Sequence, residues 1–178
     1  DNADKNNSFF DLQYKTVNLL DLEWEDGRYY LMGPYVIIED ISAPANKSVS
    51  SINGEFFYDR SNPAFEQVNG YYHIDHFQRY IQSIGYKNLL NYPFRIDVRG
   101  YTIDQSAFFP AGNQSYILMG IGGVDDAEDA DVLIHEYTHA LSNVASPTSR
   151  SGTERLGLDE GYGDYFAASY SRSLGEYR

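Results

Sequence analysis

Hydrophobic residues follow a helical period over residues 64–86. Apolar positions recur there every three to five residues, and Gly85 stands near the end of the run. Residues with this spacing share one face of a helix, so the pattern predicts a long amphipathic helix. The apolar positions are Phe65, Val68, Tyr72, Phe77, Ile81 and Ile84.

The other apolar segments in the first two thirds of the chain are short, which is typical of β-strands. Residues 29–31 and 35–38 flank a Gly-Pro pair and are predicted to form two strands around a turn. Residues 94–98 alternate between apolar and charged positions, which predicts a half-buried strand. Residues 106–109 and 115–119 flank a loop with proline and glycine, which predicts a β-hairpin.

Helical signals return in the last third of the chain. Asp125 or Asp126 is predicted to cap a helix that reaches about residue 143, because aspartate oxygens accept hydrogen bonds from the free N–H groups at a helix start. The polar residues 144–157 are predicted to form a loop, and a last helix is expected from about residue 158. We therefore expect an α+β fold, with a twisted, mostly antiparallel sheet against which the long helix packs.

Composition narrows the class of protein. The chain has 178 residues, of which 42% are hydrophobic and 16% aromatic, and this favours a folded domain over a disordered chain. Cysteine is absent and no apolar run approaches about 20 residues, so disulfides, thiolate metal sites and membrane-spanning helices are not expected. The net charge of −13 opposes binding to nucleic acid or to an anionic membrane, so neither is expected as a partner.

Residues 135–139 read His-Glu-Tyr-Thr-His, an H-E-x-x-H motif inside a predicted helix. His135 and His139 are four residues apart and face the same side, where both imidazoles can bind one metal ion. Glu136 is displaced from that pair, so its carboxylate can take a proton from metal-bound water instead of binding the metal. The motif therefore predicts a catalytic metal site.

The segment 158–164 supplies the remaining residues of the predicted site. Glu160 is 21 positions after His139, which is far enough for a returning helix to place it opposite the histidine pair. Two histidines, one glutamate and an open position are the ligand set of a catalytic zinc site, and zinc is favoured because two imidazoles and one carboxylate suit it. Asp164, one turn beyond Glu160, is expected to accept the free ring N–H of His135.

In order and spacing, these residues resemble the gluzincin metallopeptidases of the thermolysin and fungalysin families. In those families an H-E-x-x-H helix is followed by a helix that carries a glutamate ligand and, four residues later, an aspartate. The matching residues here are His135, Glu136, His139, Glu160 and Asp164. Asp131 also matches an aspartate that is often found four residues before the first histidine. The resemblance extends over about residues 50–178.

The resemblance implies both a fold and an activity. The fold is a zincin-like N-terminal lobe over residues 53–143, preceded by strands and a loop over 1–52 and followed by the start of a C-terminal lobe over 144–178. The activity is that of a zinc-dependent metalloendopeptidase, which hydrolyses peptide bonds by metal-activated water with Glu136 as general base. Peptide or protein substrates and a secreted or cell-surface location follow from the same resemblance.

The predicted hairpin resembles the edge strand that binds the substrate backbone in this family. Ala107 and Phe108 are therefore expected to contact substrate, although Ser106 stands where the family usually has asparagine. The family's residue that stabilises the transition state belongs to the remainder of its C-terminal lobe and is not expected in this chain. That remainder, or a propeptide, is an expected partner.

Other interpretations of these residues stay open. The chain could be an isolated or non-catalytic lobe that binds metal and serves as a binding module without turnover. His73 and His76 are interpreted as helix-face residues, since Asp75 is the one evident acidic neighbour for a second metal site. An acidic run could hold calcium, although helix capping and solvation also explain it. That run comprises Asp125, Asp126, Glu128, Asp129 and Asp131.

Overall fold

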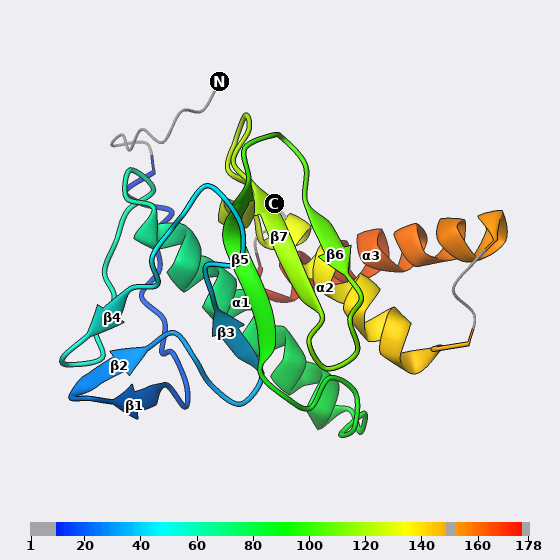
Figure 1. Ribbon diagram of the computed structural model, residues 1–178, viewed down its shortest axis with the longest axis horizontal. Coiled ribbons are helices and arrows are strands. Elements are labelled where there is room, and N and C mark those ends of the chain that lie inside the picture. The colour runs from blue at the N-terminus through cyan, green and yellow to red at the C-terminus, as the bar shows by residue number, and fades with distance from the viewer. Residues whose placement is uncertain (1–9, 149–151, 176–178) are drawn as a thin grey trace.

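The computed structural model describes residues 10–148 and 152–175, which form two β-sheets and three α-helices (Figure 1). The strands are β1 Glu23–Glu25, β2 Arg28–Tyr30, β3 Val36–Ile38, β4 Ser50–Ser51, β5 Phe94–Tyr101, β6 Ala107–Phe109 and β7 Tyr116–Gly120. The helices are α1 Ala64–Ser83, the short 3₁₀ helix η1 Asp126–Glu128, α2 Ala130–Ala145 and α3 Thr153–Ser173. The predicted α+β class is confirmed.

The larger sheet has four strands in the order β3-β5-β7-β6 and is mixed. β3, β5 and β7 run parallel, with Ile38 opposite Ile96 and Ile96 opposite Ile117. β6 and β7 form the predicted antiparallel hairpin, in which Phe108 lies opposite Ile117. Antiparallel pairing does not dominate this sheet, because the chain leaves β3 through α1 before it returns as β5, and such a crossover produces parallel neighbours.

A smaller antiparallel sheet contains β1, β2 and β4. The strands predicted at 29–31 and 35–38 are both present, as β2 and β3, but they lie in different sheets and not in one hairpin. The two strands lie in different sheets because their residues differ in burial. Val36 and Ile38 are buried and their strand contacts α1, whereas the residues of β2 are only half-buried and fit a sheet at the surface.

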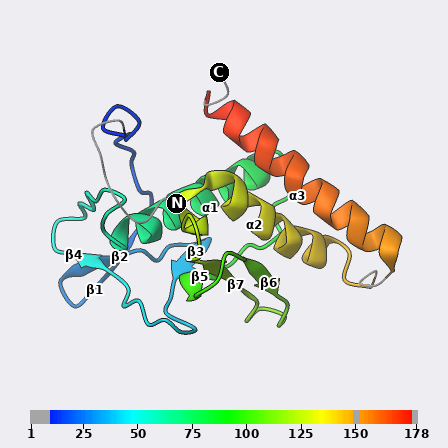
Figure 2. The same ribbon diagram turned by 90° about the horizontal axis from the view of Figure 1, so that it is seen from above.

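The helices form a layer on one face of the larger sheet. α1 and α2 lie side by side over that face, and α3 packs on α2, as Figures 1 and 2 show. α1 confirms the predicted long helix, and it buries Tyr71, Ile74 and Phe77 in the core. Tyr137 of α2 and Phe94 of β5 belong to the same core cluster. The motif helix is therefore held by packing from both the sheet and α1.

The start of α2 lies after the predicted cap residues. The Asp129 side chain accepts a hydrogen bond from the backbone N–H of Asp131 at 2.8 Å and caps the helix. Asp125 and Asp126 belong instead to the 3₁₀ turn that precedes α2. The prediction of either residue as the cap was wrong, because the chain makes one tight turn before the helix begins.

The loop between the last two helices is shorter than predicted. α2 continues to Ala145, and α3 begins at Thr153 and not near residue 158. Residues 149–151 of the predicted loop lie outside the described residues. None of the helices in the described part of the chain has the length and hydropathy that a bilayer-spanning segment requires.

The alternation predicted for β5 fails at Asp97, which is 1% exposed. Its carboxylate accepts hydrogen bonds from the backbone N–H groups of Ile41 and Ser42 at 2.9 and 2.8 Å. A third bond comes from the Arg99 backbone N–H at 3.1 Å. The charged residue is buried because it satisfies the backbone donors of the segment that follows β3.

Candidate metal centre

His135, Glu136 and His139 gather on one side of α2. One nitrogen or oxygen atom of each lies within 4.8 Å of the others, and no other group in the described residues has this metal-binding geometry. The centroids of the two imidazole rings are 4.9 Å apart, with the ring planes at 83°. The neighbouring residues Ile134 and Tyr137 are fully buried and hold the helix in the core. The arrangement can place two imidazole nitrogens on one ion.

α3 brings Glu160 to the same two rings. Glu160 Oε2 lies 3.2 Å from His135 Nε2, and Glu160 Oε1 lies 3.7 Å from His139 Nε2. The Glu160 side chain is 63% exposed, so this side of the centre is open to solvent. The structure therefore brings Glu160 next to both histidines, as the spacing predicts.

The other nitrogen of each imidazole faces an aspartate of α3. His135 Nδ1 lies 3.1 Å from Asp164 Oδ1, and His139 Nδ1 lies 3.1 Å from Asp159 Oδ2. The first contact is the one predicted for Asp164. Each ring therefore has its Nε2 toward Glu160 and its Nδ1 toward a different carboxylate.

The contact of Asp159 with His139 was not predicted from the sequence. Arg155, one turn earlier on α3, places Nη1 3.0 Å from Asp159 Oδ1. Burial raises the pKa of Asp159, but hydrogen bonds from Ser142 and Arg155 and the nearby positive charge outweigh that effect and lower the pKa below its ordinary value. Asp159 directly precedes Glu160 and lies four residues after Arg155. This spacing is the signal in the sequence that could have revealed the contact with His139.

Gly163 allows α3 to approach the motif helix closely. A Cβ atom on this residue would lie 2.7 Å from His135 Nδ1 and 2.8 Å from His135 Cε1. Gly163 is buried within the helix, and every larger residue would push against the ring. Glycine costs about 1 kcal/mol in a helix interior relative to alanine, so its presence here is explained by packing against the imidazole.

Glu136 belongs to the same group as the two histidines and is 9% exposed. Burial raises the pKa of its carboxyl group above the ordinary value, while the adjacent His139 and His135 lower it and Glu160 raises it further. The backbone of Phe108 also bonds to this carboxyl group and lowers the pKa. The net direction is upward, so Glu136 holds a proton more readily than an exposed glutamate does.

The contact with Phe108 joins Glu136 to strand β6. β6 is the last strand in the order of the larger sheet, and its residues are half-buried. Ala107 and Phe108 therefore lie at the edge of the sheet next to the metal centre. The hydroxyl of Ser106 is turned to structural partners, since it donates to Asp126 at 2.5 Å and accepts from the backbone N–H of Gly120 at 3.2 Å.

The acidic residues before and within α2 form ion pairs and hydrogen bonds with other residues of the protein. Asp125 and Glu128 pair with arginines, Asp126 and Asp131 bond to serine hydroxyls, and Asp129 caps α2. In the part of the chain that the structure describes, these residues do not form a group with metal-binding geometry. Capping therefore holds for Asp129, whereas solvation does not explain Asp125, which is 3% exposed and paired with Arg99. These contacts do not support calcium binding here.

His73 and His76 of α1 face α3, away from the metal centre. Nδ1 of His73 and of His76 lie 2.9 and 3.1 Å from the hydroxyl of Tyr170. Tyr72 stacks on His76 with ring centroids 5.6 Å apart. The two histidines thus join α1 to α3, in agreement with their interpretation as helix-face residues.

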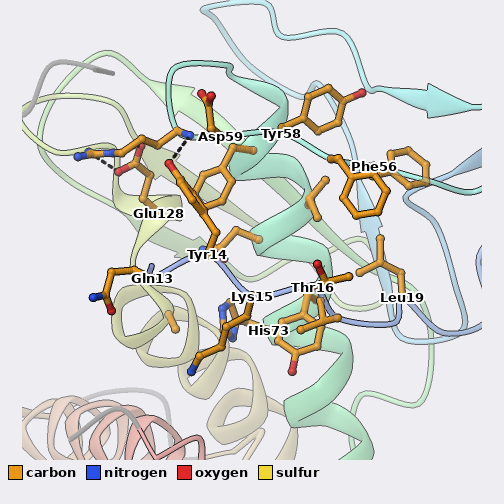
Figure 3. A pocket seen from close by; sticks show the side chains of 18 of the residues that line it. Gln13, Tyr14, Lys15, Thr16, Leu19, Phe56, Tyr58, Asp59, His73 and Glu128 are labelled. Atoms are coloured by element: carbon orange, nitrogen blue, oxygen red, sulfur yellow. Dashed lines mark hydrogen bonds and ion pairs between the residues drawn. The ribbon is translucent and has the colours of Figure 1, made fainter. Parts of the chain in front are cut away.

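A large groove of about 1500 Å³ lies away from the predicted site. It is lined by the segment 13–19, by residues around Tyr58 and by His73 of α1 (Figure 3). Arg60 and Glu128 form an ion pair of 2.5 Å at its edge. Its lining includes neither the two motif histidines nor Glu160, so groove size does not identify the chemical centre.

Comparison with protein-family models finds no match. Among characterised proteins, the extracellular metalloproteinase MEP of Fusarium vanettenii is 46% identical to this chain over 50 residues. Over that stretch the chain resembles a metalloproteinase. The stretch is 25% of this chain and only 8% of the length of the relative. Together with the His-Glu-His group, the similarity supports a metal-binding, metalloprotease-like protein.

Proposed function

We propose that this chain carries the catalytic centre of a secreted, zinc-dependent metalloendopeptidase of the gluzincin type. The observation that carries the proposal is the convergence of His135 Nε2 and His139 Nε2 on Glu160, next to the buried Glu136. The similarity to an extracellular metalloproteinase supports both the activity and the location.

The donor atoms of the centre fit zinc. Two imidazole nitrogens and one carboxylate, with no cysteine in the chain, are a ligand set that leaves a coordination position open for catalysis. His135, His139 and Glu160 would hold the ion. When bound, zinc supplies Lewis acidity and lowers the pKa of water.

Glu136 acts as the general base in this proposal. It belongs to the same compact group as the histidines, but it is buried on the side of the sheet while Glu160 is exposed. Its raised pKa allows the carboxylate to accept a proton from the attacking water and to pass that proton to the leaving amine. Asp164 orients His135 through the Nδ1 contact.

The substrate is a peptide or protein segment in an extended conformation. The outer edge of β6 offers backbone groups to such a segment, which would add to the sheet as another strand. Ala107 and Phe108 would make these contacts, and the bond between Phe108 and Glu136 would place the peptide beside the base.

We also propose a division of the chain into three parts. We place strands and a loop at 1–52, the zincin lobe at 53–143 and the start of a C-terminal lobe at 144–178. Because α2 extends to Ala145, the boundary between the last two parts fits best in the connection before Thr153. The rest of that lobe, or a propeptide, is the proposed partner.

Zinc competition against a chromogenic chelator tests the assignment of ligand and base. Glu136→Gln should bind zinc almost as tightly as the parent, because the base does not coordinate the ion. Glu160→Ala should bind zinc much more weakly, because a ligand oxygen is lost. If Glu136→Gln loses zinc as badly as Glu160→Ala does, the two roles are assigned wrongly.

Zymography on a protein substrate separates an enzyme from a non-catalytic binding module. A module would bind zinc with the same ligands and show no cleavage. We expect cleavage by the zinc-loaded polypeptide that includes both lobes, and none after treatment with a chelator. Absence of cleavage by a zinc-loaded polypeptide that includes both lobes would favour the module.

A further inference from the structure

Asp159 lies on the side of the His139 ring that faces away from Glu160. Its Oδ2 atom is 3.1 Å from Nδ1, whereas Glu160 Oε1 is 3.7 Å from Nε2 of the same ring. Nδ1 and Nε2 point away from different sides of the imidazole ring. A carboxylate that contacts Nδ1 therefore cannot coordinate the ion that Nε2 binds. Asp159 is therefore placed to orient the imidazole and not to serve as a ligand.

Two further residues hold Asp159 in this position. Arg155 of α3 places Nη1 3.0 Å from Asp159 Oδ1, and its Nη2 donates a hydrogen bond of 2.6 Å to the Ser142 hydroxyl on α2. Asp159 Oδ1 is buried, and the Arg155 guanidinium pairs with it. The side chains of Arg155 and Asp159 are 16% and 20% exposed, so water screens their attraction less than at an open surface.

The two histidines differ in how firmly they are oriented. The Asp164 side chain beside His135 is 80% exposed, and no arginine contact to it is found in the described residues. The Asp159 side chain is 20% exposed and is held from both helices through Arg155 and Ser142. The His139 side therefore has the more restricted carboxylate.

We propose that Asp159, held by Arg155 and Ser142, is the positioning residue that sets the tautomer of His139. The Asp159 carboxylate accepts a hydrogen bond from the Nδ1–H group of His139. Nε2 then carries the lone pair, which is directed toward Glu160. This inference rests on the proposed metal site, but the tautomer can be measured without a metal.

The nearly isosteric variant Asp159→Asn gives the sharpest test. Arginine offers only donors, so Arg155 should attract the carboxamide oxygen and turn the NH₂ group toward His139 Nδ1. The imidazole must then accept at Nδ1 and carry its proton on Nε2. Asp164→Asn is the matched control, since its exposed amide can turn its oxygen toward His135 and keep the proton on that Nδ1.

Nitrogen-15 NMR of the histidine side chains reads the tautomer directly. The spectra are taken without metal in a Glu160→Ala background, which removes the competing acceptor beside Nε2. A pH of about 8.5 keeps ordinary imidazoles neutral, and loss of a signal in His139→Gln assigns His139. The proton of His139 should be on Nδ1 in this background and on Nε2 after Asp159→Asn. A His139 that keeps the same tautomer in both proteins overturns the proposal.

Zinc competition in the presence of Glu160 gives the second readout. Asp159→Asn should weaken zinc binding by about 10–100-fold, and Asp159→Asn combined with Arg155→Met should recover part of the loss because the amide is free to turn. Equal affinity of Asp159→Asn and the parent also overturns the proposal. Failure of the parent itself to bind zinc would count against the proposed function, while the tautomer measurement would still decide the role of Asp159.

Discussion

Gly163→Ala should disturb the metal centre through a single added methyl group. The new Cβ would lie 2.7 Å from His135 Nδ1, 2.8 Å from Cε1 and 3.0 Å from Cγ. Ordinary van der Waals contact begins at 3.4 Å, which is 0.7 Å more than the distance from the new Cβ to Nδ1. The ring or α3 must therefore move by about this amount. His135 contacts Glu160 at 3.2 Å and Asp164 at 3.1 Å, and both partners belong to α3. A shift of this size would take either contact beyond hydrogen-bond distance.

The expected result is a fall in zinc affinity of about 10–100-fold, comparable with the loss of a residue that orients a ligand. Gly161→Ala is the matched control, because a Cβ there meets nothing within 4 Å and lies on the same helix. It should stabilise the chain by about 0.5–1 kcal/mol through helix propensity and leave zinc binding unchanged. Zinc competition and urea unfolding of both variants measure these effects. If Gly163→Ala binds zinc as tightly as Gly161→Ala does, the close approach of α3 does not control the position of His135.

Three other substitutions test separate parts of the structure. Asp164→Ala should weaken zinc binding by about 10–100-fold, measured by chelator competition, and an unchanged affinity would remove its proposed role. Asp97→Ala should lower the free energy of unfolding in urea by about 3 kcal/mol, because three backbone donors lose their acceptor; a loss below about 0.5 kcal/mol would contradict this. Burial raises the pKa of Glu66 from 4.5 to about 9 despite the Arg99 charge, so the folded chain holds an extra proton between these values and its stability should fall as pH rises. Urea unfolding at several pH values should show a weaker fall in Glu66→Gln than in the parent, and equal slopes would refute the assignment.

The parts that could be predicted from the sequence depend on local spacing. The helical period places His135 and His139 together whatever the rest of the fold does, and it likewise puts Asp164 on the same side of α3 as Glu160. The hairpin of β6 and β7 is also local, since its strands are joined by a short loop. In these cases neighbours in sequence are neighbours in space.

The parts that could not be predicted depend on long-range packing. The parallel pairing of β3 with β5 arises because α1 intervenes, and periodicity does not show where a strand returns. Asp97 appears as an exposed position in the alternation, but it is buried by backbone donors from residues 41–42. The contact of Asp159 with His139 depends on how α2 and α3 cross, which no spacing within one helix reports.

Cleavage of a protein substrate at equal zinc content tests the central claim most directly. The parent, a zinc-loaded polypeptide that includes both lobes, is compared with its Glu136→Gln variant after elemental analysis has shown about one zinc ion per chain in each. The parent should cleave the substrate, and the variant should be slower by at least about 10²–10⁴-fold because no group then accepts the proton of the attacking water. Equal rates in the two proteins would contradict the assignment of Glu136 as the base and, with it, the proposed peptidase mechanism.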